Sequence, residues 1–515
     1  MHKAVIEAGD MAFEPKEWVS FESAGRLLIV GPADKINAVI DHCQGLIIEV
    51  LVTDGGELNT EATITRLKGE LSELTGWLGD FNAVIGGVPQ KYDLLLDLNS
   101  APLLTAAVPP VGYFAPVENQ QALAEALQQL PDLVGVFDKP KYFNYKASIC
   151  AHQRRGITAC TQCLDACPAE AIQSVGELIE VNPNLCQGCG SCTAVCPSGA
   201  ISYAVPTLDQ SMDRLRAMLK QYVALERKPA QLLIHDTLQG EQLLAVYAEQ
   251  LPVTVIPFSV EEIGALGLPF WLAALAYGVS NITVWDAGSH SDHDWQALQQ
   301  QIELANELIG GLGYPAAISW FHGQRPAALK THLNQLPKVN LETTANFAGL
   351  DEKRRVSHLA LTHLHQQAPA PIGELELTET APFGEVIVDA KGCTLCMSCV
   401  SVCPVGALVD GVDKPQLNFI EDLCVQCGMC ETACPENVIS LAPRYLFDRE
   451  QARQKQLLHE EAVFHCISCQ KPFATQKMID TITAKLKDHP MFQNGALEHL
   501  KMCEDCRVKA QFRRG

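Results

Sequence analysis

Twenty of the 21 cysteines in this 515-residue sequence lie between Cys150 and Cys506, mostly two or three residues apart. Four runs follow the pattern Cys-x2-Cys-x2-Cys-x3-Cys-Pro, one of them with a departure. Three thiolates two residues apart on a tight loop can face three corners of one iron–sulfur cubane, while the fourth begins a short helix that reaches toward another site. Disulfide frameworks are typical of small secreted chains, and structural zinc does not need this repeated pattern. The spacing therefore predicts iron–sulfur ligation.

The two later runs are complete and lie in tandem, from Cys393 to Cys403 and from Cys424 to Cys434. Such a pair resembles the bacterial [4Fe–4S] ferredoxin family, in which the fourth cysteine of each run ligates the other cluster. The resemblance implies one cluster held by Cys393, Cys396, Cys399 and Cys434. It implies a neighbouring cluster held by Cys424, Cys427, Cys430 and Cys403.

The earlier pair of runs shows the same pattern with one departure, because Ile157 stands where the first cysteine of its first run should be. Cys150, ten positions before Cys160, is the expected replacement on a longer loop. The same resemblance then implies one cluster on Cys150, Cys160, Cys163 and Cys196. The other cluster would be held by Cys186, Cys189, Cys192 and Cys167. If Cys150 does not reach, the first of these sites would hold a three-iron cluster or a labile fourth iron.

The C-terminal cysteines form two separate pairs, Cys466-x2-Cys469 and Cys503-x2-Cys506. Paired cysteines of this spacing fit a closed tetrahedral zinc site with a structural role, and a fifth iron–sulfur cluster is the competing interpretation. Cys43 stands alone and is expected to be a buried structural thiol.

The elements expected around these cysteines predict the fold class, which is a multidomain α/β and α+β chain. Two ferredoxin-like dicluster modules are expected at 146–205 and 384–445, inserted among α/β domains with parallel sheets at 1–145 and 207–380, the latter including a linker. A helical tail with the zinc-knuckle-like segment is expected at 446–515. A mixed-charge stretch, 447–461, is interpreted as its first helix.

Short apolar runs alternate with helical segments in both α/β domains, which predicts parallel strands with helices on the faces of the sheet. The strands expected in the first domain are 26–30, 46–52 and 93–98, with helices at 33–42 and 119–130. The second domain is expected to have strands at 231–235, 253–257, 282–286 and 316–321, alternating with helices at 240–250, 264–277 and 294–309. His358, His363 and His365 have no carboxylate partner at metal spacing, so surface positions are expected for them.

The formal charge of −22 argues against nucleic acid and against an anionic membrane surface as partners, and favours docking to a basic patch on another protein. No apolar stretch of 18 residues is unbroken, so direct membrane insertion is not expected. The first residues lack the apolar core of a signal peptide, and a cytoplasmic location is expected.

The order of parts resembles the large 4Fe–4S binding proteins that accompany bacterial formate dehydrogenases. The residues that carry this resemblance are 137–156, 424–436 and 466–507. It implies redox protein partners, with formate dehydrogenase subunits as the candidates. In the middle domain, residues 255–264 and 272–287 resemble the iron–sulfur delta subunit of hydrogenase–heterodisulfide reductase systems. That family's cluster cysteines have no counterpart here, so no [2Fe–2S] centre is expected.

Electron transfer through four [4Fe–4S] clusters is the function expected from these features. No phosphate loop, nucleophile elbow or metalloprotease motif occurs, so no catalytic residue is expected. Two alternatives stay open: an accessory or maturation protein of a dehydrogenase, and an iron–sulfur subunit of an oxidoreductase with an unrecognised substrate site.

Overall fold

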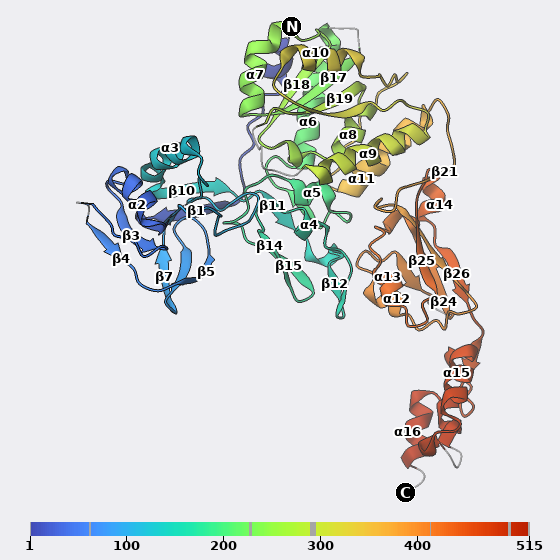
Figure 1. The fold of residues 1–515 in the computed structure, drawn as a ribbon. Coiled ribbons are helices and arrows are strands. Elements are labelled where there is room, and N and C mark those ends of the chain that lie inside the picture. The colour runs from blue at the N-terminus through green and yellow to red at the C-terminus, as the bar shows by residue number, and fades with distance from the viewer. Residues whose placement is uncertain are drawn as a thin grey trace.

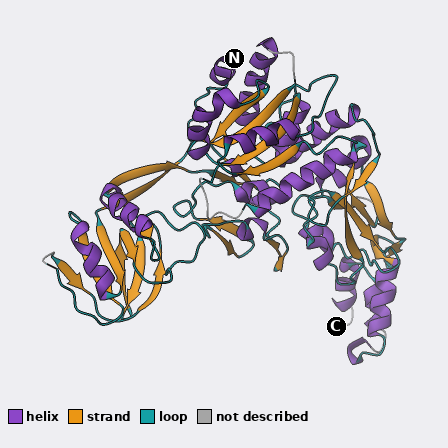
Figure 2. Cartoon of the chain, turned by 45° about the horizontal axis from the view of Figure 1, so that its top comes forward, coloured by secondary structure: helices purple, strands orange, loops and turns teal. Residues whose placement is uncertain are grey.

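A computed structural model describes residues 2–60, 63–225, 229–288, 295–411, 414–492 and 496–512. It combines two units built on parallel sheets with small antiparallel units that carry the cysteines (Figure 1). Figure 2 shows the strands of the two parallel sheets well separated from each other. Within the described residues, no helix has both the length and the apolar character needed to cross a membrane.

The N-terminal unit is built on a five-stranded parallel sheet with the order β4-β3-β2-β8-β9. Its strands are β2 Arg26–Gly31, β3 Ile47–Val52, β4 Ile64–Arg66, β8 Leu94–Asp97 and β9 Tyr113–Phe114. Both faces of the sheet are covered, which explains the continuous apolar runs of β2 and β8. One face packs on helices α2 (Ala33–Val39) and α3 (Gln120–Gln129), and the other on an antiparallel sheet of β5 Leu71–Thr75, β6 Phe81–Ile85 and β7 Val88–Tyr92.

A two-stranded antiparallel ribbon leads from this unit to the first cysteine-rich region. It pairs β1 (Trp18–Ser23) with β10 (Gly135–Pro140). Helix α1 (His2–Ala8) lies elsewhere, because it packs on helix α6 (Leu208–Leu225) of the middle unit. The chain therefore begins against the middle unit before it forms the N-terminal sheet (Figure 1).

The first cysteine-rich region surrounds two short helices with short strand pairs. The helices are α4 (Gln162–Asp165) and α5 (Ser191–Val195), which contact each other. The pairs, all antiparallel, are β11 Phe143–Tyr145 with β16 Ile201–Tyr203, β12 Gln153–Arg154 with β13 Ile157–Thr158, and β14 Ile172–Val175 with β15 Leu178–Val181.

The middle unit has a four-stranded parallel sheet in the order β18-β17-β19-β20, as the alternating pattern predicts. The strands are β17 Ala230–Asp236, β18 Val255–Val260, β19 Val279–Asp286 and β20 Ile318–His322. Helices cover both faces. Alternate strand residues pack with α6, α8 (Leu268–Ala276), α9 (Gln296–Gly311) and α11 (Lys353–Gln366) on one face, and with α7 (Gln239–Tyr247) and α10 (Pro326–Gln335) on the other.

The second cysteine-rich region repeats the layout of the first. Helices α12 (Ser398–Val402) and α13 (Met429–Thr432) contact each other. The strand pairs are β22 Gly384–Val388 with β25 Ile439–Leu446, and β23 Leu408–Asp410 with β24 Gln416–Phe419. Strand β21 (Glu374–Glu376) joins the other end of β25.

The helix predicted over 447–461 is wrong for most of its length. Only α14 (Arg449–Arg453) is helical, and β26 (Gln456–Glu460) pairs with β24. The free edge of β24 offers backbone hydrogen bonds that outweigh the weak helix propensity of a mixed-charge stretch.

The C-terminal segment extends beyond the second region (Figure 1). Its elements are the antiparallel pair β27 (Val463–His465) and β28 (Pro472–Thr475), followed by α15 (Gln476–Leu486) and α16 (Glu504–Phe512). The boundaries of the five predicted domains stay predictions.

Candidate iron–sulfur sites

The irregular site of the first region is closed by a hairpin. Cys150, Cys160, Cys163 and Cys196 line one cavity. Strands β12 and β13 lie between Cys150 and Cys160 and bring the chain back, so that the Cys160 amide donates to the Ala151 carbonyl at 3.1 Å. The buried His152 fixes this return, because its Nδ1 lies 2.9 Å from the Cys160 carbonyl and its Nε2 2.7 Å from Ser174 Oγ. Cys150 is thus placed where the missing cysteine would act.

A matching cavity in the second region is lined by Cys393, Cys396, Cys399 and Cys434. The fourth of these cysteines belongs to the other run, as in the interleaved ferredoxin arrangement. Cys396 is exposed, whereas Cys393, Cys399 and Cys434 are buried.

Members of the two remaining sets lie in the same cores: Cys167, Cys186 and Cys192 in that of the first region, and Cys403, Cys424 and Cys430 in that of the second. Burial, followed by the charges of Cys189, Cys186 and Cys167, raises the pKa of Cys192 far above its ordinary value. Burial and the charges of Cys424, Cys427 and Cys403 raise the pKa of Cys430 in the same way. The structure therefore places two of the predicted sets in one cavity each, while the division of all sixteen cysteines into four ligand sets stays a prediction.

Backbone geometry explains how each regular loop aims its thiols. The residue that follows the second cysteine has a left-handed conformation in every complete run: Gly190 (φ 83°), Met397 (φ 60°) and Gly428 (φ 78°). It begins the short helix that carries the third cysteine. In the irregular run the equivalent residue, Thr161, has φ −118°. The left-handed pair Arg155 and Gly156 instead forms the turn of the β12–β13 hairpin.

Backbone amides also point at the fourth cysteine of a run in both regions. The amide of Ala171 donates to Cys167 Sγ at 3.3 Å, and that of Ala407 donates to Cys403 Sγ at 3.2 Å. Hydrogen bonds to ligand sulfur stabilise the reduced form of an iron–sulfur cluster and so help set its reduction potential.

The surroundings fit a thiolate-bound cluster. Apolar side chains such as Ile172, Ile179 and Ile201 pack with the cysteines of the first region, and Leu417 and Phe419 with those of the second. Burial raises the pKa of Cys163 and Cys399 to about 12. These thiols would stay protonated at neutral pH unless a bound cation compensates the thiolate charge.

Four cationic side chains, which the sequence analysis did not single out, bind the carbonyls of the cysteine loops. Lys139 Nζ donates to Cys186 O at 2.7 Å, and Lys353 Nζ to Cys196 O at 3.0 Å. Lys477 Nζ donates to Cys393 O at 2.9 Å, and Arg354 Nη2 to Asp422 O at 3.1 Å. All four lie outside the cysteine runs in the sequence, so no spacing rule could have found them.

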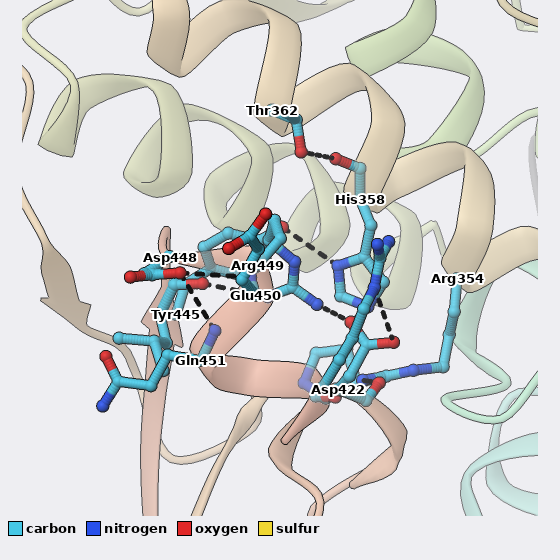
Figure 3. Close-up of polar contacts among 12 residues, drawn as sticks. Arg354, His358, Thr362, Asp422, Tyr445, Asp448, Arg449, Glu450 and Gln451 are labelled. Carbon is cyan, nitrogen blue, oxygen red and sulfur yellow. Dashed lines mark hydrogen bonds and ion pairs between the residues drawn. The ribbon is translucent and has the colours of Figure 1, made fainter.

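Next to Arg354, the surface position expected for His358 is wrong. His358 is 7% exposed, with Nδ1 2.9 Å from Tyr445 Oη and Nε2 3.7 Å from an Asp422 oxygen. Its ring points from α11 toward Asp422 and Arg449, which are themselves paired (Figure 3). Burial, then the neighbouring arginines, holds the pKa of His358 well below its usual value, so the ring is neutral. His363 and His365 are half-buried and contact backbone carbonyls.

The C-terminal cysteines form a separate compact group. The sulfur atoms of Cys466, Cys469, Cys503 and Cys506 lie within 4.8 Å of one another, a spacing that could hold one metal ion. Although burial acts to raise it, the backbone amides of Cys503, Cys469 and Ser468 lower the pKa of Cys466 to about 6. The direction of this shift is opposite to that at Cys163 and Cys399, where burial raises the pKa. Cys43, in contrast, is buried as expected, with Sγ 3.7 Å from Val39 O.

Two families match the cysteine-rich regions. A family described as the LdpA Fe-S cluster-binding domain matches residues 158–205, and one described as the 4Fe-4S dicluster domain matches residues 392–439. The first match begins after Cys150, so it contains every predicted ligand of that region except Cys150, the expected replacement for a cysteine at position 157.

Short stretches of the chain are similar to known redox proteins. A stretch of 40 residues is 50% identical to Hydrogenase-4 component A of Escherichia coli, and one of 42 residues is 43% identical to Ferredoxin 7Fe of Hydrogenibacillus schlegelii. Each covers 8% of this chain, and they span 20% and 51% of the two relatives. A ferredoxin of Alicyclobacillus acidocaldarius is 44% identical over 41 residues, which cover 8% of this chain and 50% of that protein. The two cysteine-rich regions are therefore iron–sulfur cluster-binding modules of the [4Fe–4S] ferredoxin type, called the first and second modules below.

Proposed function

We propose that this chain is an electron conduit that carries four [4Fe–4S] clusters between redox protein partners. The observation that supports this most strongly is that one predicted set lines a single cavity in each of the two adjoining modules. A protein that used one cluster as a structural element would not need four sets. Bound clusters supply reversible one-electron chemistry at potentials set by their surroundings.

The ligands proposed for the first module are Cys150, Cys160, Cys163 and Cys196 at one site, and Cys167, Cys186, Cys189 and Cys192 at the other. Those proposed for the second module are Cys393, Cys396, Cys399 and Cys434, and Cys403, Cys424, Cys427 and Cys430. The cavity that Cys150 shares with Cys160 supports a complete fourth ligand set over a three-iron cluster.

Zinc is proposed for Cys466, Cys469, Cys503 and Cys506. The mutual distance of at most 4.8 Å between the sulfur atoms fits a single tetrahedral ion better than a cubane cluster, which holds its ligand sulfurs farther apart. The ion would tie the turn between β27 and β28 to the beginning of α16.

The partners proposed are redox proteins, with formate dehydrogenase subunits as the first candidates, and the location proposed is the cytoplasm. The similarity to ferredoxins and to a hydrogenase component supports the class of partner. The formal charge of −22 supports a basic docking patch on that partner.

Metal analysis of the anaerobically purified full-length chain tests the proposal. We expect about sixteen irons, about sixteen sulfides and one zinc per chain, together with EPR signals of reduced [4Fe–4S] clusters after dithionite treatment. Eight irons or fewer would contradict the four-cluster assignment. Clusters that stay oxidised while formate and a formate dehydrogenase turn over would contradict that partner.

A further inference from the structure

The two modules contact each other beside two of the four cysteine sites. Strand β13 of the first module contacts helix α13 of the second. Cys160 follows β13 by two residues, and Cys427 precedes α13 by two residues. Both cysteines therefore lie two residues from the contact between the modules. We call the sites of Cys160 and Cys427 the facing sites, and those of Cys189 and Cys396 the outer sites.

The contact is built by the departure from ferredoxin spacing. Strand β13 belongs to the hairpin that occupies the interval between Cys150 and Cys160. A regular run would place a cysteine at position 157 and would have no hairpin there. The hairpin between Cys150 and Cys160 thus brings Cys150 to the position of the missing first cysteine of the run. It also provides the surface that touches α13.

Two neighbouring residues of α11 bind one module each. Lys353 Nζ donates to the carbonyls of Thr193 (2.9 Å), Ala194 (2.5 Å) and Cys196 (3.0 Å), which belong to the first module. Arg354 donates to the carbonyls of Pro382 (2.7 Å) and Asp422 (3.1 Å), at the second module. Successive side chains of a helix diverge by about 100°, so a single turn can reach both modules.

Both cationic side chains, Lys353 and Arg354, bind loops that belong to the facing sites. Cys196 is a member of the Cys160 site, and Arg354 binds the carbonyl of Asp422, two residues before Cys424 of the Cys427 site. A cavity between the modules is lined by Gln162 and Cys196 of the first module, by Lys353 and Arg354, and by Pro382 and Phe383 at the entry to the second. The turn of α11 therefore lies between the two facing sites.

We propose that the facing sites are the junction through which electrons cross between the modules, and that the β12–β13 hairpin and the Lys353–Arg354 pair hold this junction. The inference rests on the proposed function. One electron leaves a reduced cluster at one facing site, which is oxidised from [4Fe–4S]+ to [4Fe–4S]2+, and reduces the other cluster from 2+ to 1+. No proton moves and no bond forms or breaks.

Lys353 and Arg354 are positioning residues in this proposal. Each holds the backbone of a cysteine loop, and each places a positive charge where electron transfer adds a negative one. Because tunnelling rates fall steeply with distance, the crossing depends on keeping the two facing sites together. The outer sites are then the two ends of the row.

Two double variants of the full-length chain test the junction. Cys189→Ser with Cys396→Ser removes both outer clusters, and Cys163→Ser with Cys427→Ser removes both facing clusters. After dithionite reduction, we expect a spin-coupled EPR spectrum from the first variant and two independent signals from the second. Independent signals from the first variant, with about eight irons bound, would overturn the junction and leave the proposed function intact. Iron missing from the unmodified chain would instead overturn the proposed function.

Charge variants that keep every cysteine give a second test if the double variants lose their clusters. We expect Arg354→Gln to lower the midpoint potential of a facing cluster and Arg354→Lys to restore it. Lys477→Gln, at the Cys393 loop, is the matched control and should lower the potential of an outer cluster only. Unchanged potentials in Arg354→Gln, or a shift in the same cluster as in Lys477→Gln, would contradict the positioning role.

Discussion

The two modules share a layout and differ in their surroundings. Each has two short helices in contact, an outer strand pair and an inner hairpin. The first module is enclosed: its helix α5 packs on α9 and on residues 263–265, and none of its cysteines is exposed. The second module has Cys396 exposed and meets the middle unit through α11 and β21. The same ligand pattern is thus used once as an internal element and once as a more open one.

Removal of the clusters should give the largest difference between the modules. Both cores include their own cysteines, so cluster binding contributes directly to folding. We expect the anaerobically prepared apo chain to lose hydrogen-exchange protection throughout 384–446. The region 143–203 should keep partial protection, because α9, Lys139 and Lys353 hold it from outside. Peptides of β17 to β20 serve as the internal control, and equal loss in both modules would contradict the enclosed character of the first.

Substitution of the first ligand should distinguish the irregular run from a regular one. In Cys393→Ser we expect loss of a whole cluster, about four irons, because Cys396 is exposed and the opened site is accessible to solvent. In Cys150→Ser we expect loss of about one iron and a three-iron EPR signal in the oxidised protein, because the hairpin still holds Cys160, Cys163 and Cys196 together. Iron analysis and EPR of both variants measure this. An unaltered spectrum in Cys150→Ser would show that Cys150 is not a ligand.

Substitution of two equivalent glycines tests how tightly the first module is packed against the middle unit. Gly190 and Gly428 occupy equivalent left-handed positions. A Cβ at Gly190 would lie 2.5 Å from the backbone of Gly264 and Ala265, whereas one at Gly428 meets nothing within 4 Å. We expect Gly190→Ala to cost about 2–5 kcal/mol and Gly428→Ala about 1–2 kcal/mol. Denaturant unfolding followed by cluster absorbance gives both changes in the free energy of unfolding. Equal changes would mean that residues 263–265 can move away from α5 with little loss of stability.

Two serines that contact cysteine sulfur provide the smallest test. Cys189 Sγ lies 3.7 Å from Ser191 Oγ, and Cys396 Sγ lies 3.4 Å from Ser398 Oγ. Loss of one such hydrogen bond should lower a cluster's midpoint potential by about 20–60 mV. We expect Ser191→Ala to show the larger shift, because water can replace the hydroxyl beside the exposed Cys396. Redox titration of both variants measures the two midpoint potentials. A larger shift in Ser398→Ala than in Ser191→Ala would contradict the expected difference between the modules.

Sequence patterns predicted the elements whose structure depends on residues close together in the chain. The parallel strands follow from apolar runs such as 230–236 and 279–286, which are buried on both faces. The neighbouring cysteines of each run follow from spacing, because a short loop permits few arrangements of its thiols, whereas the crossing fourth ligand is implied by the ferredoxin resemblance and stays a prediction. The strand β26 was missed since its partner β24 lies about 40 residues earlier in the chain.

The contacts of Lys353 and Arg354 with the two modules could not be predicted for the same reason. Nothing local in the sequence Lys353-Arg354 indicates that one side chain meets Cys196 and the other Asp422. Likewise, burial of His358 in the middle unit depends on Tyr445 and Asp422, which belong to the second module. The absence of a cysteine at Ile157 was the one available signal, and it indicated a longer loop without indicating what the loop contacts.

The position of Lys353 also has a consequence for how the protein is made. Lys353 lies 157 residues after the Cys196 carbonyl that it binds. At about 5–20 residues per second, the ribosome needs roughly 10–30 s to add that length. During this interval the nascent chain has a complete first module whose Cys196 loop still lacks its buried cation. Docking of α11 therefore comes late in synthesis, and a chain released before residue 353 would have a first module without this buried cation.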